Sequence, residues 1–131
     1  MITLCWNQFD QAISLLSSQF KDCPISGVFG VPRGGLCLAV ALSHSLDVPM
    51  LKVPESGALI VDDIYDTGRT LKALRLEFPS AHFAVWVSKC SPLWWHAATC
   101  VETSEWLLFP WENVSNVKKD EQAYRVSRLS H

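Results

Sequence analysis

Two neighbouring carboxylates near the middle of the chain are placed where they could bind a ligand. Asp62 and Asp63 follow the continuously apolar run 58–61, which is typical of a strand buried on both faces of a sheet. Ligands of open α/β sheets bind beyond such strand ends. Carboxylates at this place suit sugar hydroxyls or a metal ion, and burying two of them together has a cost that a simple turn does not require. The pair therefore predicts a hydroxyl-rich or cationic ligand.

The loop directly after this pair has the composition of a phosphate site. Residues 66–70 read Asp-Thr-Gly-Arg-Thr and combine two hydroxyls, a glycine and the start of an expected helix. The free backbone amides of a helix start attract a phosphate dianion, and glycine lets the backbone come close to it. The alternative is an ordinary turn in which Asp66 caps the next helix. Together, the acids and the loop predict a sugar-phosphate site.

The elements that position these residues follow from the apolar pattern, which alternates between helical and strand-like segments. Such alternation predicts one α/β domain with a parallel sheet flanked by helices. Helices are expected at 7–20 (capped by Asn7), 35–46 and 70–78, and strands at 26–31, 50–53, 58–61 and 83–88. The helix 35–46 is apolar almost all round, so we expect it to be buried between the sheet and another layer. Segments 97–101 and 106–109 are expected to form a cap or an edge hairpin.

Length and composition restrict the class of protein. A chain of 131 residues with 49% hydrophobic content can bury one core, and its net charge of −2 argues against general binding to nucleic acids or membrane surfaces. No run approaches the roughly 18 apolar residues of a membrane span. Five cysteines are odd in number and lack the paired spacing of a zinc site. We therefore expect a cytoplasmic protein that binds small molecules.

Three segments resemble a known family. Residues 61–71, Val-Asp-Asp-Ile-Tyr-Asp-Thr-Gly-Arg-Thr-Leu, resemble the phosphoribosyl pyrophosphate (PRPP) signature of type I phosphoribosyltransferases. Residues 28–36, Val-Phe-Gly-Val-Pro-Arg-Gly-Gly-Leu, resemble the pyrophosphate loop of the bacterial xanthine-guanine branch, and residues 105–112 resemble its purine-contacting strand and Pro-Trp-acid turn. The resemblance implies the type I fold, a Rossmann-like sheet with a reduced C-terminal cap, in a domain spanning 1–112. Residues 113–131 would follow as a polar, partly loose tail.

The resemblance implies transfer of a 5-phosphoribosyl group from PRPP to a 6-oxopurine base, with Mg²⁺, in purine salvage. The ribose hydroxyls would lie on Asp62 and Asp63, directly or through the metal. The 5'-phosphate would bind the signature loop: Asp66, Thr67, Gly68, Arg69 and Thr70. Departure of pyrophosphate needs donors, which Arg33 and the amides of Gly34 and Gly35 can provide at a helix start. In relatives this loop contains a cis peptide bond, which here would join Pro32 and Arg33.

The resemblance also assigns the purine base to four residues. Asp66 would exchange a proton with the base, and Lys89 would donate to its 6-oxo oxygen. Trp106 would stack on the ring, and the Leu107 carbonyl would reach the 2-position. Leu108 stands where relatives of this branch have a carboxylate, so guanine, xanthine and hypoxanthine remain equally open. The plainer alternatives are a surface lysine for Lys89 and core packing for Trp106.

One departure from the family lies between Lys52 and Gly57, where only four residues join two expected strands. Family members insert a mobile lid at this place, and its loss is expected to admit water and weaken catalysis. Two hypotheses therefore remain. The chain is either a minimal phosphoribosyltransferase, expected as a homo-oligomer like its relatives, or a catalytically weak module that binds PRPP or a nucleotide and reports to a partner.

Overall fold

The computed structural model describes residues 1–129, which form two compact units. The larger unit comprises residues 10–102, and the smaller one combines residues 1–9 with the chain from residue 103 onward. The boundary that we expected at residue 112 lies inside the smaller unit, because the N-terminal strand pairs with a strand just before it. Within the described residues, no helix has the length and apolar character needed to cross a membrane.

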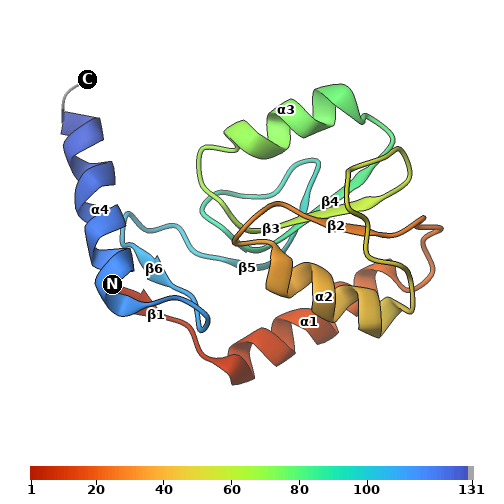
Figure 1. Cartoon of the computed structure of the whole chain (residues 1–131), viewed down its shortest axis with the longest axis horizontal. Helices are drawn as coiled ribbons and strands as arrows, with labels where there is room; N and C mark the ends of the chain where they lie inside the picture. The colour runs from red at the N-terminus through yellow and green to blue at the C-terminus, as the bar shows by residue number, and fades with distance from the viewer. Residues whose placement is uncertain (130–131) are drawn as a thin grey trace. The chain divides into compact units, whose positions relative to one another are not determined.

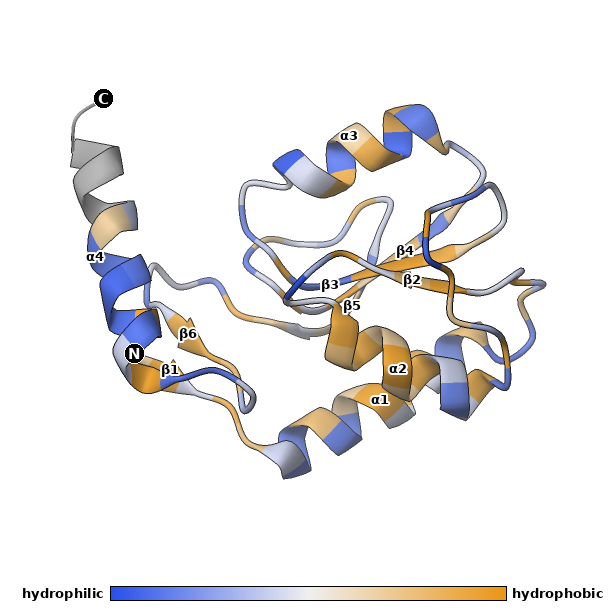
Figure 2. Ribbon diagram, in the orientation of Figure 1, coloured by the Kyte–Doolittle hydropathy of each residue, from blue (hydrophilic) through white to orange (hydrophobic). Residues whose placement is uncertain are grey.

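A four-stranded parallel sheet forms the centre of the larger unit, as predicted. Its spatial order is β2-β3-β4-β5, and every neighbouring pair is parallel. The strands are β2 (Val28–Gly30), β3 (Leu59–Tyr65), β4 (His82–Ser88) and β5 (His96–Cys100). β2, the first half of β3 and most of β4 are strongly hydrophobic (Figure 2), which suits a sheet covered on both faces.

The chain changes direction across this sheet between β2 and β3. After β2 it forms α2 (Leu36–Leu46), touches the outer edge of β2 through a single bridge between Val28 and Met50, and then crosses back to form β3 on the other side. The strand predicted at 50–53 is therefore wrong beyond this one bridge, because Lys52 and Val53 turn out into solvent ahead of Pro54. A reversal of this kind opens a crevice beyond the strand ends where ligands of α/β sheets bind.

Strand β3 is longer than predicted. The apolar run 58–61 suggested an end at Val61, but the strand continues to Tyr65 because β4 continues beside it, with Asp62 opposite Val85 and Tyr65 opposite Ser88. On the other side, β2 ends opposite Val61. The two aspartates therefore lie within a strand that has lost one of its neighbours, at the point where the sheet opens.

Helices cover both faces of this sheet (Figure 1). α3 (Arg69–Glu77) lies over one face, and α2 lies over the other together with the part of α1 (Trp6–Phe20) that belongs to this unit. Leu38 and Leu42 of α2 are fully buried, but Leu36 and Val40 are 41% and 47% exposed. The described residues of its own unit therefore cover one side of α2, and the side with Leu36 and Val40 lacks the second layer that we expected.

The start of α1 also differs from the prediction. The helix begins at Trp6, one residue before the expected Asn7 cap. The backbone N–H of Cys5 donates to the Gln8 side chain at 2.8 Å, so a glutamine in the first turn, rather than an asparagine cap, contacts the chain ahead of the helix.

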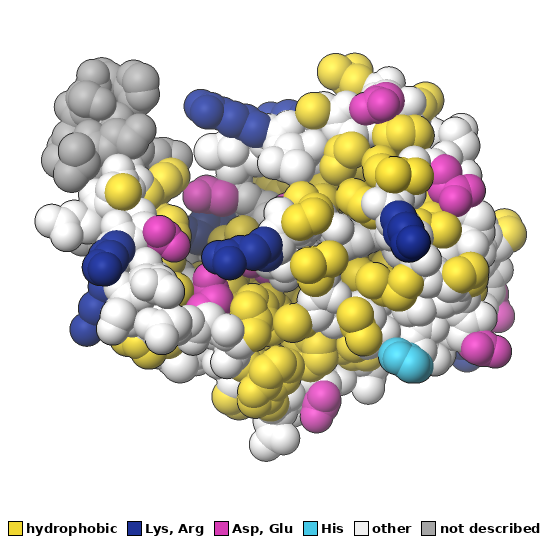
Figure 3. All heavy atoms as spheres, viewed as in Figure 1, with side chains coloured by type: hydrophobic (Ala, Val, Ile, Leu, Met, Phe, Trp, Pro, Cys, Tyr) yellow, Lys and Arg dark blue, Asp and Glu magenta, His cyan; other side chains and the backbone are white. Residues whose placement is uncertain are grey.

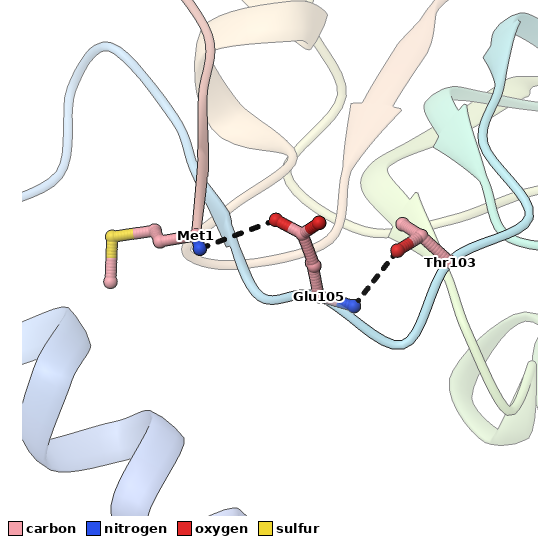
Figure 4. Close-up of polar contacts among 3 residues, drawn as sticks. All are labelled: Met1, Thr103 and Glu105. Atoms are coloured by element: carbon pink, nitrogen blue, oxygen red, sulfur yellow. Dashed lines mark hydrogen bonds and ion pairs between the residues drawn. The ribbon is translucent and has the colours of Figure 1, made fainter.

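The smaller unit is built on a two-stranded parallel sheet of β1 (Ile2–Thr3) and β6 (Leu107–Leu108), followed by α4 (Val114–Leu129). The N-terminal ammonium lies 3.3 Å from the Glu105 carboxylate, whose own backbone N–H donates to Thr103 (Figure 4). The edge hairpin that we considered for these two segments does not form, because β5 joins the main sheet while β6 pairs with β1. The segment expected as a loose tail forms α4, whose first amides are capped by the Asn113 side chain.

Candidate active site

The loop after β2 lies directly against the acidic end of β3. The Val31 N–H donates to the Val61 carbonyl at 2.9 Å, and the Gly35 N–H donates to the Val31 carbonyl at 2.8 Å. Gly34 faces the Asp63 carboxylate so closely that a Cβ at residue 34 would lie 2.2 Å from Asp63 Oδ2. The structure thus brings together the two segments that we expected to hold opposite ends of one ligand. The Pro32–Arg33 peptide bond is cis, as predicted.

Asp62 and Asp63 form a closely coupled pair of half-buried carboxyls. The Asp63 backbone N–H donates to Asp62 Oδ1 at 2.8 Å. Burial raises the pKa of Asp62. Burial and then repulsion from Asp62 raise the pKa of Asp63 to about 8. At neutral pH and without ligand, Asp63 therefore holds a proton. Such a pair is stabilised by a ligand that supplies positive charge or hydroxyl donors.

The chemistry of this donor set fits Mg²⁺. Two adjacent carboxylates suit the ion, and the described residues contain no group of three or more His, Cys, Asp or Glu side chains that would make a closed cage. Mg²⁺ usually takes its remaining ligands from substrate oxygens and water. The pair is therefore suited to a metal that arrives with a phosphorylated substrate.

The raised pKa of Asp63 predicts an unusual dependence of stability on pH. A carboxyl whose folded pKa lies above its unfolded value of about 3.9 binds its proton more tightly when folded, so the free energy of unfolding falls as pH rises from about 4 to about 8. We expect the unfolding midpoint in EDTA to fall by about 10 °C or more over this range. Asp63→Asn should flatten this fall. A variant with the same slope as the wild type would show that Asp63 is not its source.

The loop after β3 forms a pocket of about 200 Å³ beside the acidic pair. Its lining comprises Asp62 and the continuous run 64–71. Gly68 has a φ of 76°, a conformation that favours glycine, and it is the N-cap of α3. Gly68, rather than Asp66, therefore begins the helix. Thr67 Oγ1 accepts a hydrogen bond from the Arg69 N–H at 3.4 Å, and the Asp66, Arg69 and Thr70 side chains are exposed.

Lys89 lies at the same end of the sheet. It directly follows β4 and is half-buried, and its backbone N–H donates to the Tyr65 carbonyl at 2.9 Å. The loops that begin at Asp66 and at Lys89 therefore start side by side. A base bound near Asp66 could contact Lys89 only if the two loops lie together in this way.

Trp106 and Leu107 belong to the smaller unit and are described within it. Trp106 is half-buried and makes an edge contact with the Tyr124 ring of α4, with centroids 5.3 Å apart. Leu107 is buried in β6. The following turn is closed by Glu112, whose carboxylate accepts a hydrogen bond from the Phe109 N–H at 2.8 Å. The purine-binding roles of Trp106 and Leu107 remain predictions.

Comparison with known proteins identifies the family. No protein-family model matches the chain. A xanthine-guanine phosphoribosyltransferase of Nitratidesulfovibrio vulgaris is 31% identical over an alignment of 134 positions, gaps included. This alignment covers 82% of this chain and 82% of the relative. The chain belongs to the xanthine-guanine phosphoribosyltransferase family. A relative of the same description from Chromohalobacter salexigens is 28% identical and covers 84% of this chain and 83% of its own.

Solved structures agree with this assignment. A purine phosphoribosyltransferase of Pyrococcus horikoshii superposes with a TM-score of 0.70 at 31% identity, covering 86% of this chain and 94% of that one. The xanthine-guanine-hypoxanthine phosphoribosyltransferase of Helicobacter pylori, at 23% identity and a TM-score of 0.64, covers 90% and 98% and supports the fold alone. The prediction of a type I phosphoribosyltransferase and of its fold is therefore confirmed.

Two further features of this phosphoribosyltransferase are a tyrosine that we did not predict and the short link before β3. Tyr65 was not predicted, although it sits inside the signature and lines the pocket after β3. An aromatic residue directly before a loop of small and polar residues was the available signal. The link between the Met50 bridge and β3 is short, as the sequence indicated, and it ends in a turn in which Gly57 has a φ of 82°.

Proposed function

We propose that this phosphoribosyltransferase transfers the 5-phosphoribosyl group of PRPP to a 6-oxopurine and releases pyrophosphate, in purine salvage. One observation carries the proposal. The pocket after β3 combines Asp62 with the small-residue loop, and the neighbouring loop places Gly34 against Asp63. A phosphate site, a hydroxyl or metal site and a second anion site are thus adjacent. This is the order in which the 5'-phosphate, ribose and pyrophosphate groups follow one another in PRPP.

Each group of residues has a role in the transfer. The bond between C1' and the pyrophosphate oxygen breaks, a bond forms between C1' and an imidazole nitrogen of the base, and the proton on the base passes to a carboxylate. Arg33 and the Gly34 amide stabilise the charge that develops on pyrophosphate. The Gly35 amide, which the sequence also suggested, does not take part, because its N–H already donates to the Val31 carbonyl. The amides of the loop 66–70 hold the 5'-phosphate, with the hydroxyls of Thr67 and Thr70. Asp66 accepts the proton.

Mg²⁺ would be held on the Asp62 and Asp63 side and would offset the negative charge of the substrate oxygens when bound. The chain's own task at this place is to keep two carboxylates side by side. The Asp63 N–H contact to Asp62 and the close approach of Gly34 both serve that purpose. Binding of the metal and substrate would also release the proton that Asp63 holds at neutral pH.

Recognition of the base is assigned to Lys89, Trp106 and Leu107. A lysine donor favours a 6-oxo oxygen over the amino group of adenine, because an ammonium group has no acceptor. Trp106, which is half-buried, would stack on the ring of the base. The Leu107 carbonyl would contact the 2-position.

A panel of bases tests the function directly. Pyrophosphate release is measured from PRPP and Mg²⁺ with guanine, xanthine, hypoxanthine, adenine and orotate in separate reactions. We expect turnover with at least one 6-oxopurine and none with adenine or orotate. Turnover with none of the five, alongside measurable binding of PRPP or a nucleotide, would overturn the transfer reaction and leave a binding module.

The stacking role of Trp106 predicts a selective effect on the base. Trp106→Ala should raise the KM for the base about tenfold, since stacking on an aromatic side chain contributes about 1–3 kcal/mol, while the KM for PRPP stays near that of the wild type. Trp6→Ala is the matched control, because Trp6 is an exposed tryptophan of the same unit. Equal changes in both variants, or none in Trp106→Ala, would remove Trp106 from the base site.

We expect the enzyme to act as a homo-oligomer, with the exposed side of α2 at an interface. Leu36 and Val40 lie one turn apart on this side, and Figure 3 shows hydrophobic side chains gathered over α2. Exposed apolar area of this kind marks interaction surfaces. Light scattering should give a mass above that of one chain for the wild type and a lower mass for Val40→Glu. A monomeric wild type would contradict this expectation.

We place the enzyme in the cytoplasm. All five cysteines are free thiols in the structure, and three of them are exposed. Exposed free thiols are usual in a reducing compartment. Recovery of the native protein from the soluble cytoplasmic fraction of its host would test this placement, and recovery from an oxidising compartment would contradict it.

A further inference from the structure

Tyr65 is the last residue of β3 and stands between the acidic pair and the phosphate loop. Its side chain is only 4% exposed. The ring lies flat on the Trp95 indole, with centroids 3.8 Å apart and an interplanar angle of 9°. The edge of Trp94 closes one further side at 5.9 Å. The two indole rings therefore restrict the orientation of the Tyr65 side chain.

The phenol end of Tyr65 reaches the residue on which the phosphate loop turns into α3. A Cβ at Gly68 would lie 2.2 Å from the phenol oxygen and 2.3 Å from Cζ, so the Gly68 backbone rests on the phenol. Gly68 is the N-cap of α3, and its carbonyl accepts the first helical bond, from the Lys72 N–H at 2.8 Å. The amides proposed to hold the 5'-phosphate follow directly after this supported residue.

Trp95 is itself held at a buried point of the neighbouring strand. Its indole N–H donates to Ser88 Oγ at 3.1 Å, and the Ser88 hydroxyl donates to the Cys90 carbonyl at 2.6 Å. Ser88 is fully buried, and it is the last residue of β4. A chain of contacts therefore runs from the end of β4 through Trp95 and Tyr65 to the N-cap of α3.

We propose that Tyr65 and Trp95 are positioning residues for the 5'-phosphate loop, with the Tyr65–Trp95 stack acting as a wedge under Gly68. This inference rests on the proposed function and extends it to two residues that do not themselves bind the substrate. The wedge fixes how far the start of α3 stands from the end of β3, and with it the direction of the loop amides. A displacement of about 1 Å in such a loop is enough to cost about 100-fold in rate.

The alternative is that the stack only fills the core, since both rings belong to the hydrophobic cluster on the α3 face of the sheet. The two roles predict different results. A filler would lower the stability of the fold and leave the affinity for PRPP unchanged in the fraction that is folded. A wedge would lower that affinity even where the variant is fully folded.

Four variants separate these roles when PRPP affinity is measured by calorimetry with Mg²⁺ well below each unfolding midpoint. Tyr65→Leu and Trp95→Leu should weaken PRPP binding about tenfold or more. Tyr65→Phe keeps the ring and should stay within about threefold of the wild type. Phe83→Leu is the control, because Phe83 is a buried member of the same cluster that lies at the start of β4, away from the loop. Phe83→Leu should lower the unfolding midpoint without changing the affinity for PRPP.

The proposal is overturned if Tyr65→Leu changes PRPP affinity no more than Phe83→Leu does. Because the readout is binding, it does not depend on turnover. A wild type that binds PRPP but converts no base would defeat the transfer reaction and would still allow the wedge to be judged from the variants. A wild type that binds no PRPP would overturn both.

Discussion

Replacement of Asp66 by asparagine is expected to lower the turnover number about 100-fold or more while the affinity for PRPP stays within about threefold of the wild type. The side chains have nearly the same shape, so the loop proposed to hold the 5'-phosphate should keep its conformation. Asparagine cannot accept the proton of the base, however, and a well-placed general base contributes about 10²- to 10⁴-fold. Steady-state kinetics and calorimetry on the same preparation measure the two quantities.

The acidic pair provides the contrast for this result. Asp62→Ala and Asp63→Ala should mainly weaken the Mg²⁺-dependent binding of PRPP, because we assign their carboxylates to the ribose and the metal rather than to the base. Equal loss of affinity and turnover in all three variants would contradict this division of roles. Asp66 would then be only another part of the PRPP site.

Gly34→Ala is expected to reduce kcat/KM for PRPP about 100-fold with only a small loss of stability. The new Cβ would lie 2.2 Å from Asp63 Oδ2, and a side chain can move away from it more easily than a backbone can. Asp63 would therefore leave its place beside Asp62, or the pyrophosphate loop would shift. Either change disturbs the geometry of the site, where a 1 Å error costs about 100-fold.

Gly35→Ala is the matched comparison. A Cβ there would lie 2.5 Å from the Val61 carbonyl oxygen, which belongs to the backbone of a central strand, so we expect a loss of about 1–3 kcal/mol in the free energy of unfolding. Urea unfolding separates the two variants. If the clash with the Asp63 carboxylate causes the loss of stability in Gly34→Ala, the double variant Gly34→Ala/Asp63→Ala should be as stable as Asp63→Ala alone. A loss that persists in the double variant would point to the loop backbone instead.

The signature segment shows how far sequence reasoning reaches. Asp62, Asp63 and the loop 66–70 were predicted from residue types alone, because acids after an apolar strand and small residues before a helix have few structural uses that do not involve a ligand. Their place at one sheet end also followed from the parallel topology. The exact end of the strand did not, since it depends on β4 continuing beside β3 as far as Ser88.

Other elements depended on partners that the local pattern does not reveal. Residues 50–53 are apolar enough for a strand, yet they make a single bridge at the outer edge of β2. The segments 97–101 and 106–109 suggested a hairpin because they are close in sequence, but each pairs with a different sheet. Strand pairing is decided by long-range contacts, and a short apolar run is compatible with several of them.

By itself, the sequence determined the family and the parallel α/β fold and predicted the residues of the phosphate site, because these follow from motif chemistry and from periodicity along the chain. Only the tertiary structure decided that Gly34 closes on Asp63, that burial and repulsion raise the pKa of that carboxyl to about 8, and that Tyr65 supports Gly68 from a stack on Trp95. Each of these features is a contact between backbone or side-chain atoms whose distance is set by how strands and loops pack. No pattern of residue types along one segment specifies such a distance.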